Sequence, residues 1–346
     1  MVVANSVLLF LVKMAFLVTT LTDVSGLRTL GLGKRLSMSV RRRVPMSTSV
    51  LALELVRVDG GTLPDWSPGA HIALHLPNGM ERQFSLCGDP ADRLAYRIGV
   101  LLEPNGRGGS EFIHHHLHEG AAIDISEPLN TFGLTQATRY HFVAAGIGIT
   151  PILGMLDAAE SFGADWKLTY LGKSRDSMAF LEELQRFGDR VSLYPKDEVG
   201  RQDLSALIGE PAYDTLIYVC GPESVLSDVE GAMSVWPSGS LHTERFAPKA
   251  KSPFEPDAGS FAVKLARSGL LLQVPPDKSI LSVVEEAGLI VPFSCREGTC
   301  GTCETMILAG EADHRDSVLS AEEQECNETM MICVSRATTP LLELDL

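Results

Sequence analysis

The chain has 346 residues, of which 45% are hydrophobic and 21% charged, and its formal net charge is −15. This length is enough for two or three domains, and the acidic balance argues against nucleic acid as a partner, since a phosphate backbone attracts basic surfaces. The acid is concentrated late in the chain, because residues 257–346 hold 15 Asp and Glu against 6 Lys and Arg. This region is either a solvated surface or a docking face for a basic redox partner.

Residues 1–36 form an N-terminal extension unlike the rest of the chain. Residues 2–21 are almost wholly apolar and long enough for a membrane helix, but Lys13 is a costly charge within such a span. No basic region or small-residue cleavage site marks a signal peptide. The extension is therefore either a mis-assigned start, with the true start at Met14 or Met38, or a membrane anchor. We expect a cytoplasmic protein with no membrane contact unless this extension is real.

Residues 37–136 predict a small antiparallel β-barrel. Apolar or alternating runs at 51–56, 71–76 and 96–102 are separated by turn sequences such as D-G-G and P-N-G. The sequence R-Q-F-S at 82–85 ends a strand. Its Arg and Ser around an aromatic ring suit a phosphate and a flat ring system, although these four residues fit an exposed Arg beside a core Phe better.

A second candidate phosphate site is G-R-G-G-S at 106–110, which precedes a helical pattern beginning near Glu111. Four histidines follow in or near this helix. Only His114 and His118 would share a helix face, and no partner ligand is evident. We therefore interpret the four as solvated helix residues and not as a metal site. The histidines are His114, His115, His116 and His118.

Residues 137–247 alternate strand and helix, which predicts a parallel sheet with crossover helices. We expect strands at 141–145, 167–171, 190–194 and 216–220, and helices at 151–162, 178–187, 203–208 and 223–235. The sequence A-A-G-I-G-I-T-P at 144–151 closes a strand and opens a helix. Gly146 and Gly148 allow a close approach to a phosphate, Thr150 is a candidate N-cap, and Pro151 suits the first helical position.

A second motif of this kind is C-G-P, formed by Cys220, Gly221 and Pro222 at the end of another predicted strand. Together the two motifs predict nucleotide binding. Ser174 and Arg175 follow the second strand of this region, where a ribose 2′-hydroxyl or 2′-phosphate is read. NADPH is therefore not excluded as an alternative to NADH. Residues 248–260 carry three prolines without periodicity and predict a linker.

The region from 261 to 346 contains the most specific signal. Cysteines in the spacing C-x4-C-x2-C, followed by a fourth after 29 intervening residues, are the ligand set of a plant-type [2Fe-2S] cluster. Gly298 and Gly301 suit a loop whose N–H groups point at sulfur. Zinc is the rival, but its usual second C-x2-C pair is missing. Cys326 is the alternative fourth ligand, in a polar setting typical of an exposed helix face. The favoured ligands are Cys295, Cys300, Cys303 and Cys333.

The order of these motifs resembles the phthalate dioxygenase reductase family over residues 37–346. The resemblance implies an FMN-binding barrel, a nicotinamide dinucleotide domain with a parallel α/β sheet, and a β-grasp-like plant-type ferredoxin domain. It places Arg82, Gln83, Phe84 and Ser85 at the FMN phosphate and ring, with Gly108, Gly109 and Ser110 adding phosphate contacts. It places Thr150 at the flavin–nicotinamide junction, Cys220 near the nicotinamide, and Phe246 against the isoalloxazine. Two positions depart from the family pattern: Phe84 stands where Tyr is common and Ala145 where Gly is common.

These expectations define an NADH-dependent reductase. It would pass electrons from NADH through FMN and a [2Fe-2S] cluster to a terminal Rieske-type oxygenase, with Thr150 and Cys220 at the hydride-transfer step. The flavin joins a two-electron donor to a one-electron acceptor. Two alternatives remain. One is an FAD-dependent reductase of a di-iron monooxygenase, and the other is a non-enzymatic redox sensor or electron carrier.

Overall fold

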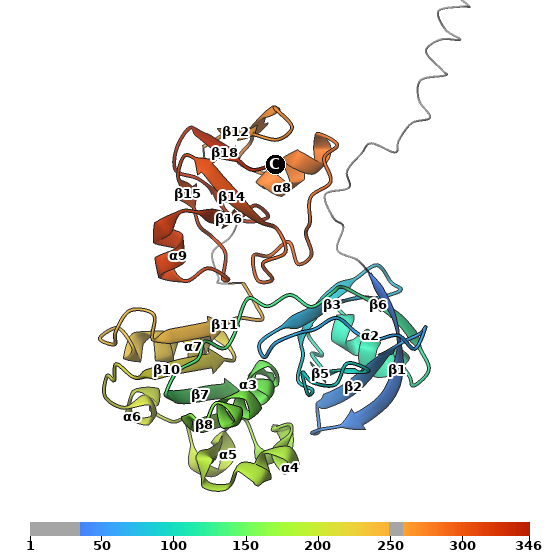
Figure 1. Ribbon diagram of the computed structural model, residues 1–346, viewed down its shortest axis with the longest axis vertical. Helices are drawn as coiled ribbons and strands as arrows, with labels where there is room; N and C mark the ends of the chain where they lie inside the picture. The colour runs from blue at the N-terminus through green and yellow to red at the C-terminus, as the bar shows by residue number, and fades with distance from the viewer. Residues whose placement is uncertain (1–34, 249–258) are drawn as a thin grey trace, which may run out of the picture.

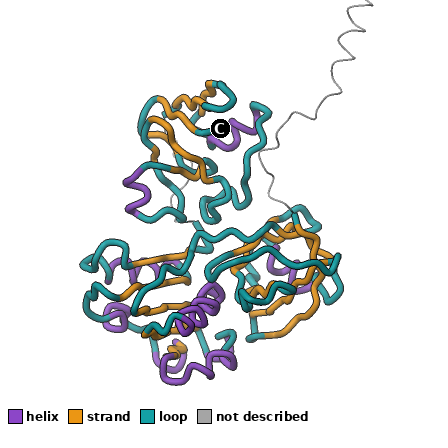
Figure 2. Tube along the Cα trace, viewed as in Figure 1, coloured by secondary structure: helices purple, strands orange, loops and turns teal. Residues whose placement is uncertain are grey.

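The computed structural model describes residues 35–248 and 259–346. The expected N-terminal anchor and most of the expected linker at 248–260 lie outside these residues. Three units built on β-sheets follow one another along the chain (Figures 1 and 2). We call them the barrel, the α/β unit and the C-terminal unit. Within the described ranges, no helix has the length and apolar character needed to cross a bilayer.

The barrel is a six-stranded antiparallel sheet with the strand order β4-β3-β6-β1-β2-β5. A bridge between Leu86 and Ile98 joins its two edges, so the sheet closes on itself. Inward-facing side chains such as Leu53, Ile72 and Leu74 are fully buried, as the alternating sequence predicts. The elements are β1 (Leu36–Pro45), β2 (Val50–Arg57), β3 (His71–His75), β4 (Glu81–Ser85), β5 (Tyr96–Leu101), α2 (Gly109–His116) and β6 (Ala122–Ile125).

The interpretation of the four histidines as solvated helix residues needs correction. Helix α2 ends at His116, so His118 lies outside it. His114 is half-buried because its Nε2 lies 2.9 Å from the Val100 carbonyl of β5. His118 Nδ1 instead lies 2.7 Å from a guanidinium nitrogen of Arg43 in β1. Two of the histidines therefore tie α2 and its C-terminal end to the barrel wall.

The α/β unit is a parallel sheet in the order β11-β10-β7-β8-β9. Helices α3 and α4 pack on one face, and α6 and α7 on the other. The central strand β7 is buried on both faces, as its apolar sequence predicts. The elements are β7 (Arg139–Ala145), α3 (Ile149–Ser161), β8 (Asp165–Gly172), α4 (Leu181–Leu184), β9 (Val191–Pro195), α5 (Lys196–Val199), α6 (Leu204–Ile208), β10 (Thr215–Cys220), α7 (Glu223–Ala232) and β11 (Leu241–Glu244), with 3-10 turns η1 (Gly146–Gly148), η2 (Arg175–Ser177) and η3 (Gln185–Arg190).

Two predicted helices were too long. The helix expected at 178–187 shortens to α4, because Phe180 takes a left-handed φ of 62° and the chain after Leu184 continues as a 3-10 turn. The helix expected at 223–235 ends at Ala232, followed by turns before Pro237. Both errors lie where an apolar pattern continues through a turn, which periodicity alone does not distinguish from a helix.

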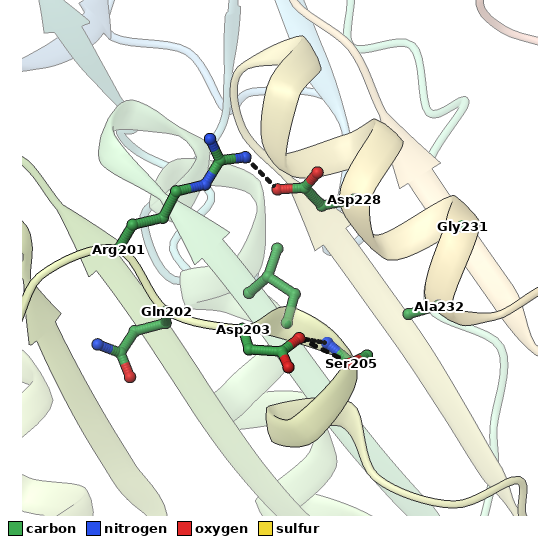
Figure 3. A pocket seen from close by; sticks show the side chains of 8 residues that line it. Arg201, Gln202, Asp203, Ser205, Asp228, Gly231 and Ala232 are labelled. Atoms are coloured by element: carbon green, nitrogen blue, oxygen red, sulfur yellow. Dashed lines mark hydrogen bonds and ion pairs between the residues drawn. The ribbon is translucent and has the colours of Figure 1, made fainter.

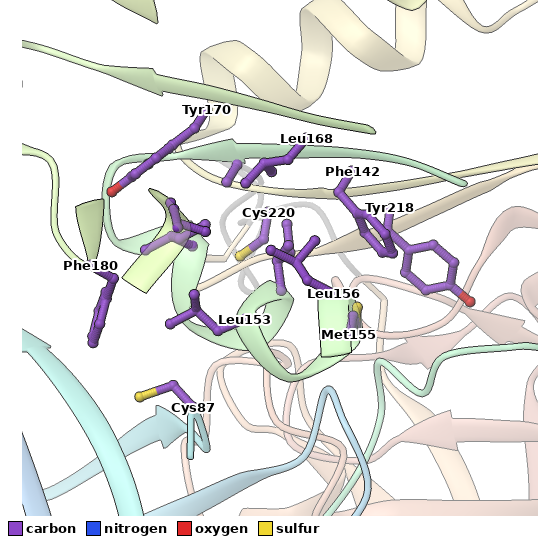
Figure 4. Close-up of a cluster of buried hydrophobic side chains, with 14 of the residues drawn as sticks. Cys87, Phe142, Leu153, Met155, Leu156, Leu168, Tyr170, Phe180, Tyr218 and Cys220 are labelled. Carbon is purple, nitrogen blue, oxygen red and sulfur yellow. The ribbon is translucent and has the colours of Figure 1, made fainter. Parts of the chain in front are cut away.

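A single apolar core joins the barrel to the α/β unit. Val50, Ala52 and Cys87 of the barrel pack in the same cluster as Leu153 of α3 and Phe180. Figure 4 shows Cys87 on the barrel side of this cluster and Leu153 and Phe180 across from it. An ion pair between Arg97 and Glu183, in which a guanidinium nitrogen lies 2.8 Å from a carboxylate oxygen, crosses the same boundary. These two units are therefore fixed to each other by buried apolar surface.

The C-terminal unit has its own separate core beneath a five-stranded sheet in the order β13-β12-β18-β14-β16. Strands β12 and β18 are parallel and central, and α8 packs beside them, which is the expected β-grasp-like arrangement. The elements are β12 (Phe261–Leu265), β13 (Leu271–Val274), α8 (Ile280–Glu286), β14 (Glu304–Ala309), β15 (Ala312–Asp313), α9 (Ala321–Cys326), β16 (Thr329–Met331), β17 (Arg336–Ala337) and β18 (Leu341–Leu344).

Candidate redox site

The barrel contains a cradle that suits a phosphate group. Gly108 is the N-cap of α2 with a left-handed φ of 82°, so it turns the chain into the helix. Arg82 lies across the next residue: a Cβ added to Gly109 would stand 2.5 Å from Arg82 Nε. The free N–H groups of a helix start and a guanidinium therefore converge at one place. Arg82 also donates to the Glu81 carbonyl at 2.7 Å, which holds its side chain there.

The neighbouring residues of β4 form the wall beside this cradle. Ser85 is 4% exposed, and its Oγ has no hydrogen-bond partner within residues 35–248 and 259–346. A buried hydroxyl without a hydrogen-bond partner costs free energy. The polar edge of a bound ring would supply the missing partner. Phe84 is half-buried against the barrel core. Ser110 Oγ accepts from the Glu103 N–H at 3.0 Å and so shapes the loop before α2.

The α/β unit brings its two glycine motifs together where β7 and β10 end. A Cβ added to Gly148 would stand 2.1 Å from the Cys220 carbonyl oxygen, so only glycine permits this approach. A Cβ added to Gly221 would stand 2.7 Å from the Ala145 methyl group. Ala145, one of the departures from the family pattern, therefore fills space that Gly221 leaves open. Neighbouring parallel strands on opposite sides of a switch in strand order form such ligand crevices.

The predicted capping of α3 was wrong. The helix begins at Ile149 with Gly148 as N-cap, so Thr150 and Pro151 are its second and third residues. Thr150 Oγ1 donates to the Ile147 carbonyl at 2.9 Å. The residue is 2% exposed, because it also faces the barrel: a Cβ on Gly99 of β5 would stand 2.7 Å from its methyl group. Thr150 thus lies at the junction of the barrel and the α/β unit.

Cys220 is fully buried at the end of β10, and its Sγ lies 3.9 Å from Glu244 Oε2 at the end of β11. Burial, with the Glu244 carboxylate beside it, raises the pKa of the Cys220 thiol well above its ordinary value. Burial also raises the pKa of Glu244 to about 8. Burial therefore favours the neutral form of the Cys220 thiol, which agrees with the apolar strand that precedes it.

The remaining predicted nucleotide contacts follow β8, β10 and β11, at the same end of the parallel sheet. Pro222 is the N-cap of α7 and leaves the helix start open. Ser174 caps the 3-10 turn η2, while Arg175 forms an ion pair with Glu198, in which its Nη2 lies 2.9 Å from Oε2. Phe246 follows β11 and is 47% exposed, an unusual position for a large apolar ring. These residues remain predicted contacts.

The four predicted ligand cysteines gather on one loop and one turn of the C-terminal unit. Cys300, Cys303 and Cys333 are buried and Cys295 is half-buried, whereas Cys326 is exposed on α9. The backbone N–H groups of Glu297 and Thr299 donate to Cys295 Sγ at 3.3 and 3.4 Å. The neighbouring Cys300 and Cys333 thiols lower the pKa of Cys295 below its ordinary value.

The backbone of this loop also fits an iron–sulfur group. Gly298 and Gly301 have left-handed φ angles of 69° and 76°, which turn the chain around the cysteines. N–H groups aimed at a thiolate are the usual environment of such a cluster. In the described part of the chain, no group of three or more His, Cys, Asp or Glu is arranged to hold one metal ion.

Several residues near these sites escaped the sequence analysis. His71 of β3 is 6% exposed and hydrogen-bonds the Cys300 backbone, so the barrel contacts the cysteine loop. Arg107 pairs with Glu297 of that loop. Arg245 is buried with Glu223 and Glu230 as its partners, which anchors the end of β11 to α7. No motif marks these residues, because their partners come from distant parts of the chain.

A further groove lies away from all the predicted sites. It has a volume of about 440 Å³ and lies between the start of α6 and α7 (Figure 3). An ion pair between Arg201 and Asp228, whose atoms lie 2.6 Å apart, crosses one end of it. Asp203 accepts from the Ser205 N–H and caps α6 beneath it. These polar groups already have partners within the groove, so we assign no ligand to it.

Comparison with known proteins agrees with this geometry. A family model described as "2Fe-2S iron-sulfur cluster binding domain" matches residues 263–338. The vanillate O-demethylase oxidoreductase of Pseudomonas sp. strain HR199 is 41% identical over 87% of this chain and 96% of its own length. The carnitine monooxygenase reductase subunit of Escherichia coli K12 is 38% identical over 87% of this chain and 95% of its own.

Solved structures show the same architecture. Phthalate dioxygenase reductase superposes with a TM-score of 0.65 at 34% identity, covering 90% of this chain and 98% of that one. An intact type IV self-sufficient cytochrome P450 monooxygenase superposes with a TM-score of 0.86 at 39% identity, covering 93% of this chain but only 43% of that one. The predicted three-part fold is confirmed. The chain belongs to the phthalate dioxygenase reductase family, the oxidoreductases that serve as reductase components of oxygenase systems.

Proposed function

We propose that this protein oxidises NADH and passes the electrons through FMN and a [2Fe-2S] cluster to a terminal Rieske-type oxygenase. The observation that carries the proposal is the joint placement of three sites. The cradle at Arg82 lies in a barrel that shares one core with the α/β unit, and the cysteine loop contacts the same barrel at His71. The bound flavin supplies the conversion between hydride and single-electron chemistry.

The residues of the chain bind, orient and exclude water. Arg82 and the N-terminus of α2 would hold the flavin phosphate, and Ser85 Oγ would gain a partner at the ring edge. Thr150 and the buried Cys220 thiol would line the junction between the nicotinamide and flavin rings. The exposed ring of Phe246 would lie against the flavin ring. Preorganised packing of this kind sets the distance and angle for hydride transfer.

FMN is favoured over FAD by what lies beyond the cradle. Arg107, immediately before the N-cap of α2, pairs with Glu297 of the cysteine loop. An adenylate extending from the phosphate in this direction would meet that pair. The other direction leads to a shallow groove on α2, where Glu111 would oppose a second phosphate. If FAD were the cofactor, its adenylate would need this groove. The groove is lined by Asn78, Gly108, Glu111, Phe112, His115 and His116.

NADH is favoured over NADPH by the partner of Arg175. Its guanidinium forms two hydrogen bonds to Glu198, at 3.0 and 2.9 Å, and its pKa is raised by that hydrogen-bonded carboxylate. Asp197 adds a second negative charge nearby. A ribose 2′-phosphate would have to displace one carboxylate and approach another, which is unfavourable.

The partner and the compartment follow from the same chemistry. The family serves oxygenases, and the acidic balance of residues 257–346 suits a basic docking partner. None of the seven cysteines, which all lie in the described residues, forms a disulfide, as expected of a protein in the reducing cytoplasm.

Anaerobic titration of the purified holoprotein with NADH tests the proposal. We expect the flavin band and the broad cluster absorbance to bleach in turn, and heat-released flavin to migrate as FMN on chromatography. Release of FAD would support the di-iron monooxygenase alternative. If NADH and NADPH both leave the spectrum unchanged although flavin and cluster are bound, the protein is a sensor or carrier and the proposal is wrong.

A further inference from the structure

Four contacts join the cysteine loop to the barrel, and together we call them the seam. Gln83 Nε2 donates to Ser294 Oγ at 2.7 Å. Arg107 forms a bidentate ion pair with Glu297, in which each terminal guanidinium nitrogen contacts one carboxylate oxygen. The His71 ring hydrogen-bonds the Cys300 backbone. The fourth contact is apolar: a Cβ added to Gly301 would stand 2.6 Å from the Thr131 methyl group, so this side chain packs against the Gly301 backbone as closely as glycine allows.

The seam differs in kind from the boundary between the barrel and the α/β unit. That boundary is a continuous apolar core, whereas the C-terminal unit has a core of its own that contains no barrel residue. Its contact with the α/β unit is also polar, through Ser238 and Glu322. Small polar interfaces of this type allow one unit to leave another, while shared apolar cores do not.

The seam lies on the same barrel edge as the flavin cradle. His71 of β3 pairs in register with Ser85 of β4, the residue with the unpartnered hydroxyl. Gln83 is two residues earlier on β4, and Arg107 directly precedes the N-cap of α2. The paired residues Ser85 and His71 therefore connect the predicted ring edge of the flavin site to the backbone of Cys300, a predicted cluster ligand.

We propose that the seam is a releasable docking device for the cysteine loop. His71, Gln83 and Arg107 act as positioning residues that hold the loop at the flavin edge for electron transfer. This inference rests on the proposed function. Gln83, which is also a predicted cofactor contact, donates its amide N–H to Ser294 in the seam. Because the loop side of the C-terminal unit is the side covered by the barrel, release of the seam exposes that side to an acceptor protein.

The Arg107–Glu297 ion pair contributes to the strength of docking at the seam. The Arg107 side chain is 66% exposed and that of Glu297 33% exposed, so salt screens their attraction. Loss of an exposed pair of this kind changes an equilibrium by about 1.5-fold to fivefold. A seam built from such contacts closes and opens readily, which a component that receives electrons on one partner and delivers them to another requires.

Hydrogen–deuterium exchange of the flavin- and cluster-loaded full chain tests the proposal. In Glu297→Gln and in Ser294→Ala, we expect the amides of residues 294–301 and 82–85 to exchange about twofold to fivefold faster than in the wild type. Exchange in the α/β sheet should be unchanged. The matched control is Glu343→Gln, which removes a Lys264–Glu343 pair of 2.9 Å on the outer face of the same unit. It should leave both seam segments unchanged.

Stopped-flow absorbance supplies a second readout. In Glu297→Gln, flavin reduction by NADH should keep its wild-type rate, whereas cluster reduction should slow. Combining Arg107→Met with Glu297→Gln should cost less than the sum of the single changes, because both remove one contact. His71→Gln, which keeps a hydrogen-bond donor, should retain more transfer than His71→Leu.

Seam amides that exchange at wild-type rates in both variants would overturn the proposal, as would faster exchange in Glu343→Gln of the same size. Strict additivity of the Arg107 and Glu297 changes would also overturn it. If NADH does not reduce the flavin of the wild type, the proposed function is wrong. The exchange measurement does not depend on NADH, so it still tests the seam.

Discussion

Replacing Gly148 by alanine should affect the rate of flavin reduction by NADH more strongly than the free energy of unfolding. Its φ is −60°, so alanine meets no backbone strain. The obstacle is steric, because the new Cβ would stand 2.1 Å from the Cys220 carbonyl oxygen, where ordinary contact begins at 3.4 Å. The two loops must therefore separate by about 1.3 Å. Overpacking of this kind costs ~1–3 kcal/mol of folding free energy.

The functional effect should be larger than the loss of stability. Misplacing a binding group by ~1 Å can slow a reaction ~100-fold. We expect anaerobic stopped-flow reduction of the bound flavin by NADH to slow by about that factor in Gly148→Ala. Cluster content should stay at the wild-type level, because the cysteine loop belongs to a separate core. Urea unfolding followed by tryptophan fluorescence gives the accompanying change in stability.

The chain offers a matched control for this substitution. Gly231 lies inside α7, and a Cβ added there meets no heavy atom within 4 Å. Gly231→Ala should therefore stabilise the helix by ~0.5–1 kcal/mol and leave the rate of flavin reduction unchanged. If Gly148→Ala reduced its flavin at the wild-type rate, the close contact between the two glycine motifs would have no role in nucleotide binding.

Three further changes test separate parts of the site. Cys300→Ser should abolish cluster absorbance and cytochrome c reduction while NADH still bleaches the flavin; retained cytochrome c reduction would contradict the assigned electron order. Arg82→Ala should lower flavin content without unfolding the barrel, as measured by flavin released per chain, and full occupancy would reject the phosphate role. Burial raises the pKa of Glu244 from 4.5 to about 8, so its stability contribution is complete below pH 4.5 and is lost as pH rises through 8. Glu244→Gln cannot ionise and should flatten that decline, whose slope is at most ~1.4 kcal/mol per pH unit, in urea titrations between those pH values; an unchanged pH profile would show that Glu244 ionises freely.

Local patterns predicted much of the fold. The alternating run at 51–56 and the apolar run at 141–145 both became the expected strands, because side-chain period and burial agree there. Helix ends were less predictable. Thr150 has the side chain of an N-cap, but the glycine at 148 had already turned the chain, and the Thr150 hydroxyl bonds Ile147 instead. Capping preference is a weak signal beside a backbone-specific glycine.

Motifs found the residues whose neighbours are close in sequence, and missed those whose neighbours are distant. The cysteine spacing identified Cys295 and Cys300 without any knowledge of the fold. His71 reads as one alternating residue of a strand, and only the docked C-terminal unit shows that it meets Cys300, more than 200 residues later. Contacts across units depend on how whole surfaces meet, which a single sequence without an alignment does not reveal.

The central position of β18 has a consequence for biosynthesis. This strand pairs with β12 on one side and β14 on the other, so it completes the middle of its sheet. It is also synthesised after every other described strand. The barrel and the α/β unit can fold while translation continues, but the C-terminal unit must wait for residues 341–344. Iron–sulfur insertion should therefore follow synthesis of β18, and a ribosome stalled before it should hold a nascent chain that binds flavin without iron.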